Sequence, residues 1–168
     1  MEKKLTVLRY ISYSFEILIL YILQGTPSLI PEIFGGKPVL LICVALTVAA
    51  FEKELPAMFF GLACGIMCDL GISNTIGYFS VILTSVCYFE ALLFKSVIVK
   101  NFFNTMLYSL CGCASIICLY FLIFYIFMGY GNALYYFLNH YASRIVYTFL
   151  CCIPVYFINK FLYTQISK

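Results

Sequence analysis

Six apolar runs, separated by short polar segments, are the main pattern along the chain. A helix that crosses a bilayer needs about 20 mostly apolar residues, and most of the runs approach that length. The runs lack the alternation of apolar and polar residues that is typical of strands in a membrane β-barrel. We therefore expect helices over Leu5–Leu23, Pro38–Phe51, Leu55–Leu70, Ile76–Phe94, Phe103–Met128 and Tyr141–Leu162. The pattern predicts an all-α polytopic membrane bundle of about six transmembrane helices.

The second and third runs are short for a complete crossing. This shortness indicates helices that are tilted or partly sheltered by their neighbours. Six spans of about 20 residues would occupy about 120 positions, so only short loops and tails remain. We expect residues 1–168 to form a single integral membrane domain.

The composition agrees with this interpretation and excludes several function classes. Apolar residues make up 64% of the chain and charged residues only 10%. A soluble domain has about 25% charged residues, so this chain has too little charge to solvate a surface in water. A soluble enzyme, a nucleic-acid-binding protein and a disordered tail are therefore excluded. Membrane lipid is the expected surrounding, and no nucleic-acid partner is expected.

The positions of the ten Lys and Arg residues predict the orientation. Cytoplasmic loops of membrane proteins carry an excess of these residues. With the N-terminus inside, eight of them fall on the cytoplasmic side: Lys3, Lys4, Arg9, Lys53, Lys95, Lys100, Lys160 and Lys168. Only Lys37 and Arg144 fall on the outer side. We expect both termini to be cytoplasmic, which an even number of spans also requires.

The sequence offers little that points to catalysis or to a cofactor. Nine cysteines are present, but no CxxC pair occurs and His140 is the only histidine. Structural zinc sites need four such ligands, usually in close pairs, whereas a cysteine within an apolar helix acts as a small packing residue. The sequence also lacks an HExxH motif, a phosphate-binding glycine loop and a nucleophile elbow. We expect a protein that is not an enzyme and has no metal or cofactor.

The third predicted helix carries the most informative pattern. Ala57, Gly61, Gly65 and Asp69 recur every fourth residue and so share one helix face. Small residues at this spacing let a neighbouring backbone approach closely in a membrane. Asp69 has two interpretations: it caps the turn into the next helix, or it contacts a partner. In the first case Asn should retain most function, and in the second Asn should behave like Ala.

Two further acidic residues lie within predicted spans and are candidates for intramembrane polar contacts. Glu16 lies in the first predicted helix, two turns from Arg9, and we expect it to face the bundle interior or a partner helix. Glu90 lies near the cytoplasmic end of the fourth predicted helix. We expect Glu90 to reach water beside Lys95.

The middle third of the chain resembles the rod-shape-determining MreD family. The shared features are a proline at Pro38, an acidic break at Glu52–Glu54, the run Gly61-xxx-Gly65-xxx-Asp69-Leu70-Gly71, and Ile76-Gly77 at the start of the next helix. Elsewhere the resemblance is limited to length and hydropathy.

This resemblance implies a non-enzymatic component of the bacterial cell-elongation machinery in the inner (cytoplasmic) membrane. Such proteins bind the bitopic protein MreC, and through it help to organise a RodA-type glycosyltransferase, a class B penicillin-binding protein and MreB filaments in peptidoglycan synthesis. The motif positions carried over are Gly61, Gly65, Asp69 and Gly77. The resemblance implies that they shape the helix pair and its packing surface.

A substrate-binding S component of an energy-coupling-factor vitamin transporter is the alternative. Those proteins are similar to this chain in size and in having six helices, and they hold a small solute in an outward-facing pocket. That family commonly carries a stripe of small residues in its first helix, whereas Leu5–Leu23 contains neither alanine nor glycine.

Overall fold

The computed structural model describes residues 2–26, 36–71, 77–96, 100–127, 135 and 137–166. Within these ranges every regular element is a helix, which confirms the expected all-α bundle. The elements in chain order are α1 (Glu2–Gly25), α2 (Leu40–Phe51), α3 (Glu54–Gly71), α4 (Tyr78–Ser96), α5 (Phe102–Phe121), two π-helical turns η1 (Leu122–Ile126) and η2 (Phe137–Ala142), and α7 (Ser143–Ile166).

Five helical stretches are long and apolar enough to cross a membrane, which supports a multi-pass membrane protein. They are Lys4–Gly25, Glu54–Gly71, Tyr78–Ser96, Phe102–Ile126 and His140–Ile166, and α2 is a shorter apolar helix. The predicted boundaries at Ile76 and Met128 lie outside the described residues. The last helical stretch begins at Phe137, before the predicted start at Tyr141. His140, just before the predicted start, therefore lies within helical backbone, which satisfies its own polar groups.

Helix α2 is the centre of the bundle. All twelve of its residues are buried, and it contacts α1, α3, α4, α5 and α7. A helix that is apolar on every side has no polar face to turn to water, so it packs inside a larger structure. The expectation of a short helix sheltered by its neighbours is therefore confirmed for the second run. The third run forms α3, which is long enough to cross a membrane and exposes apolar side chains on one side.

Side chains from other helices complete the backbone hydrogen bonding at the start of α2. The first N–H groups of any helix have no partner within the helix, and a buried helix end cannot bond to water. Here the N–H of Val39 donates to Oγ1 of Thr148 on α7, at 3.2 Å. The N–H of Leu41 donates to Oε1 of Gln24 on α1, also at 3.2 Å. These bonds fix α2 between the first and last helices.

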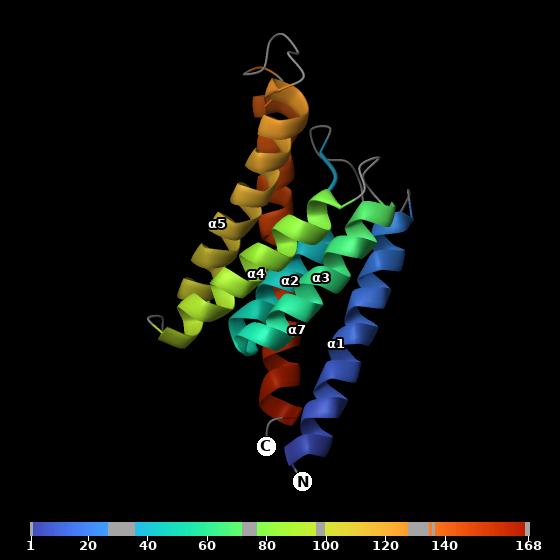
Figure 1. Cartoon of the computed structure of the whole chain (residues 1–168), viewed down its shortest axis with the longest axis vertical. Coiled ribbons are helices and arrows are strands. Elements are labelled where there is room, and N and C mark those ends of the chain that lie inside the picture. The colour runs from blue at the N-terminus through green and yellow to red at the C-terminus, as the bar shows by residue number, and fades with distance from the viewer. Residues whose placement is uncertain are drawn as a thin grey trace.

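The two groups of basic residues predicted from the charge pattern lie at opposite ends of the bundle. Both chain termini lie at one end (Figure 1). A cavity at that end is lined by Arg9, Lys53, Lys95 and Lys100. At the other end Gly36, which precedes Lys37, packs against the backbone of Arg144. The two ends are thus as expected, and the cytoplasmic location of the terminal end stays a prediction.

Candidate functional site

The small-residue face of α3 packs against α4, and this pair makes the most extensive helix contact in the described structure. A Cβ atom on Gly65 would lie 2.5 Å from Cα of Ser80 and 2.7 Å from the carbonyl oxygen of Phe79. A Cβ atom on Gly61 would lie 3.0 Å from Cβ of Cys87. Only a hydrogen atom fits at Gly65, whereas a Cβ at Gly61 would require its neighbours to shift by a few tenths of an ångström. The glycines therefore allow the two backbones to approach closely.

Asp69 ends this face and binds the start of α4. Its Oδ2 atom accepts hydrogen bonds from the N–H of Gly77 at 3.1 Å, the N–H of Ser80 at 3.0 Å and the hydroxyl of Ser80. Its Oδ1 atom accepts one from the N–H of Phe79 at 3.0 Å. The first turn of a helix has N–H groups without intrahelical partners and a positive dipole end, and a carboxylate satisfies both.

Gly77 gives the backbone before α4 the conformation in which the first N–H groups of α4 point at Asp69. Its φ is +98°, a backbone conformation that residues with a side chain rarely adopt. Gly61, Gly65, Asp69 and Gly77 thus all contribute to the contact of α3 with α4. Ala57, on the same face of α3, is completely buried. Because α4 occupies the face, it is not open to a partner helix. The hydroxyl donor Ser80 was missed from the sequence, although a serine in the first turn of a helix is a typical capping partner.

Glu16 faces the interior of the bundle, one of the two locations expected for it. It lies on the same side of α1 as the buried residues Tyr13 and Ile17, and 9% of it is exposed. Neither carboxyl oxygen has a hydrogen-bond partner among the described residues. Glu16 also lines an apolar groove of about 660 Å³ between α1 and α7.

The expectation for Glu90 was wrong. Glu90 is only 5% exposed, and both of its oxygens are buried without a hydrogen-bond partner in the described part of the chain. It shares its face of α4 with Leu83 and Cys87, which are completely buried, so the helix turns it inward. Lys95 points elsewhere and binds Glu54 at 2.5 Å.

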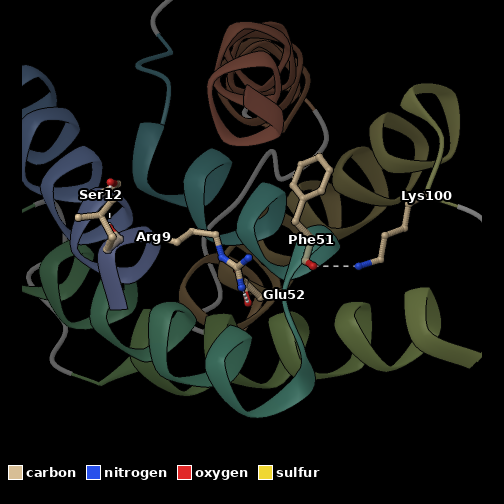
Figure 2. Close-up of polar contacts among 6 residues, drawn as sticks. Arg9, Ser12, Phe51, Glu52 and Lys100 are labelled. Carbon is tan, nitrogen blue, oxygen red and sulfur yellow. Dashed lines mark hydrogen bonds and ion pairs between the residues drawn. The ribbon is translucent and has the colours of Figure 1, made fainter. Parts of the chain in front are cut away.

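A second polar cluster lies at the terminal end of the bundle, where α1, α2 and α7 meet. Figure 2 shows the Arg9 side chain directed at Glu52, which follows α2; Nε of Arg9 lies 2.6 Å from Oε1 of Glu52. In the same view Nζ of Lys100 donates to the carbonyl oxygen of Phe51, at 2.8 Å. The Arg9 guanidinium also lies 4.9 Å from the ring centre of Tyr163. These contacts provide polar partners at the C-terminal end of α2 and connect that end to α1 and α7.

Burial of the Glu52 side chain disfavours its charged form. Desolvation raises the pKa of its carboxyl, and the Arg9 guanidinium works against this by lowering it. The side chains of both residues are largely buried, at 12% and 3% exposure for Arg9 and Glu52. The ion pair is therefore a place where removal of one partner leaves a charge without compensation.

Replacement of Arg9 by glutamine should destabilise the protein by about 3 kcal/mol at neutral pH, because Glu52 is left as an unpaired buried charge. Loss of Arg9 also raises the pKa of Glu52 further. The defect should shrink as the pH falls below that raised pKa, since protonation removes the charge. Equilibrium unfolding in mixed micelles over a pH series measures this.

The Arg9→Gln/Glu52→Gln variant is the control for this prediction. It should recover most of the stability and lose the pH dependence, because two neutral amides can bond to each other. An equal loss in the single and double variants would show that the pair is not coupled.

No protein-family model, curated protein or solved structure matches the chain. The interpretation of both clusters therefore depends on their own geometry.

Proposed function

We propose that the chain is a non-enzymatic component of the bacterial cell-elongation machinery, as its resemblance to the MreD family implies. In this proposal it lies in the bacterial inner membrane with both termini in the cytoplasm. It binds an MreC-like bitopic protein and so helps to organise peptidoglycan synthesis by a RodA-type glycosyltransferase and a class B penicillin-binding protein.

One observation carries the proposal: the residues of the resemblance act together in the structure. Gly61 and Gly65 set the approach of α3 to α4, and Asp69 binds Gly77 and the first turn of α4. These positions span 61–77 in the sequence, and in the described residues they join α3 to α4. A motif whose residues build a helix pair fits a scaffold, and this supports the proposal.

Partner helices would have to use the outer faces of the bundle, because the small-residue face of α3 is filled by α4. Large apolar side chains are exposed along these outer faces, among them Ile11 and Phe15 on α1 and Phe157 and Phe161 on α7. Such faces suit lipid and other transmembrane helices, where packing replaces the hydrophobic force that acts in water.

Purification of the tagged protein from its native membrane in mild detergent, followed by mass spectrometry, tests the proposal. We expect an MreC-like bitopic protein or a RodA-type synthase among the proteins recovered. Recovery of paired ATPase subunits with a small solute would instead identify a vitamin-transporter component. Recovery of neither, in the presence of an intact bundle, would contradict both.

The orientation is tested by labelling single cysteines introduced at Lys53 and Lys37, which are both exposed and lie at opposite ends. We expect a membrane-impermeant maleimide added to intact cells to label position 37 and to label position 53 only after lysis. The cysteines to remove first are Cys111, Cys118 and Cys151, because the other six are buried. The reverse pattern would place the termini outside.

A further inference from the structure

The cavity at the terminal end of the bundle has the size and position of a ligand site. Its volume is about 590 Å³, within the usual range for sites that hold a small molecule. It is lined by the first turns of α1, the last residues of α2 and α4, and the end of α7. It therefore lies at the level of the helix ends, where lipid headgroups meet the protein.

The charges around this cavity do not cancel. Four cations line it: Arg9, Lys53, Lys95 and Lys100. Arg9 is paired with Glu52, and Lys95 with Glu54. Neither Lys53 nor Lys100 has a carboxylate at ion-pair distance among the described residues. Two positive charges are thus left facing the same space.

Of these two lysines, Lys100 gives the stronger indication of a bound anion. Its ammonium donates to a neutral acceptor, the carbonyl oxygen of Phe51, and lies 5.6 Å from the ring centre of Tyr163. Desolvation lowers the pKa of Lys100, the nearby Glu52 carboxylate raises it, and the Arg9 charge lowers it, so that the pKa is lowered overall. A bound anion would offset this lowering, because it would add negative charge beside an ammonium whose desolvation Glu52 compensates only in part.

The remaining lining makes the cavity amphipathic. Leu5, Phe94 and Ile166 contribute apolar surface beside the cations. A phosphate that is attached to an apolar molecule matches this combination better than a free carboxylate does. Basic pockets between transmembrane helices at the cytoplasmic side characteristically bind the phosphates of anionic lipids.

We propose that this cavity binds the phosphate of an anionic lipid from the leaflet at the terminal end, with Lys53 and Lys100 as the residues that recognise its charge. Arg9 stays paired with Glu52 and shapes the wall of the site. The proposal does not depend on the function proposed above, since any polytopic membrane protein can hold such a lipid.

The experiment compares lipid binding to the purified full chain in neutral detergent, measured by native mass spectrometry and by protection from thermal unfolding. The probes are phosphatidylglycerol, zwitterionic phosphatidylcholine and inorganic phosphate. We expect the wild type to prefer phosphatidylglycerol. The Lys53→Gln/Lys100→Gln variant should bind phosphatidylglycerol about thirtyfold more weakly, since each basic residue near the headgroup contributes about 1 kcal/mol.

Two further variants make the result specific. Lys37→Gln removes the same charge at the opposite end and should change phosphatidylglycerol binding less than about twofold. Lys53→Arg/Lys100→Arg keeps both charges and should keep binding. If the double glutamine variant does not fold, Lys53→Gln alone serves, because Lys53 is exposed and its loss removes no backbone bond.

Equal binding of phosphatidylglycerol and phosphatidylcholine by the wild type would overturn the proposal. So would an equal loss of binding in Lys37→Gln and in the double variant, because the effect would then be a general property of the surface. A third outcome is that the wild type binds inorganic phosphate, the double variant does not, and the wild type prefers neither lipid. This outcome would support a phosphate site and would overturn a lipid as the source of the phosphate.

Discussion

Replacement of Gly65 by leucine should prevent the chain from forming its native bundle. Even the Cβ atom of alanine would lie 2.5 Å from Cα of Ser80 and 2.8 Å from its backbone nitrogen, closer than real Cβ contacts. These are backbone atoms, so no rotation of a side chain relieves the clash, and α3 and α4 must separate. We expect Gly65→Ala to cost more than about 3 kcal/mol and Gly65→Leu to give no folded protein.

The glycines of the chain offer a graded control for this prediction. At Gly112 a Cβ would meet only side-chain atoms, the ends of Leu46 at 3.0 Å and of Val86 at 3.4 Å, and a small shift of the Leu46 side chain relieves the contact. Gly112→Ala should therefore be tolerated, and Gly61→Ala should fall between the two. Leu62→Val, at a residue that is 37% exposed, should change little. Unfolding in mixed micelles gives the order, and equal tolerance at Gly65 and Gly112 would contradict the close packing of α3 on α4.

Asp69→Ala should have the second largest effect, a loss of about 4 kcal/mol. The substitution leaves the N–H groups of Gly77, Phe79 and Ser80 without the carboxylate that accepts from them, at a helix end that is largely buried. Each unsatisfied donor of this kind costs about 1–3 kcal/mol, and water at the membrane surface recovers part of that. The same unfolding assay measures the loss.

Asparagine at this position is the informative comparison. Both carboxylate oxygens of Asp69 accept hydrogen bonds, whereas asparagine has one acceptor and would turn its NH₂ group toward another donor. Asp69→Asn should therefore lose about half as much stability as Asp69→Ala, rather than retain nearly all of it. Ser80→Ala removes one of the four donors and should cost about 1 kcal/mol. An equal loss of stability for Asn and Ala would show that the negative charge at the start of α4, rather than the number of hydrogen bonds, is what stabilises this end.

The helices and the packing face of α3 could be predicted from the sequence because each depends on a local rule. Apolar runs form helices in a bilayer since lipid offers no hydrogen bonds to the backbone. Ala57, Gly61, Gly65 and Asp69 share a face since they recur at the helical period. Which helix packs against that face depends on the tertiary structure and cannot be predicted from a local sequence pattern.

The contacts that sequence reasoning missed are those between distant segments. Sequence spacing makes Arg9 a neighbour of Glu16, seven residues along the same helix, but the partner of Arg9 is Glu52, at a separation of 43 residues. Nearness to the end of a helix predicts contact of Glu90 with water beside Lys95, whereas its position on the inward face of α4 buries it. Both outcomes depend on how the helices are arranged around α2.

The burial of α2 also leads to an expectation about when this helix enters the membrane. Twelve residues of helix rise about 18 Å, well short of the hydrocarbon thickness of about 30 Å. A segment this short does not become a stable span by itself during insertion, and its first N–H groups depend on Gln24 before it and Thr148 far after it. We therefore expect the outer helices to enter the lipid first, and α2 to reach its final position only after α7 has packed against it.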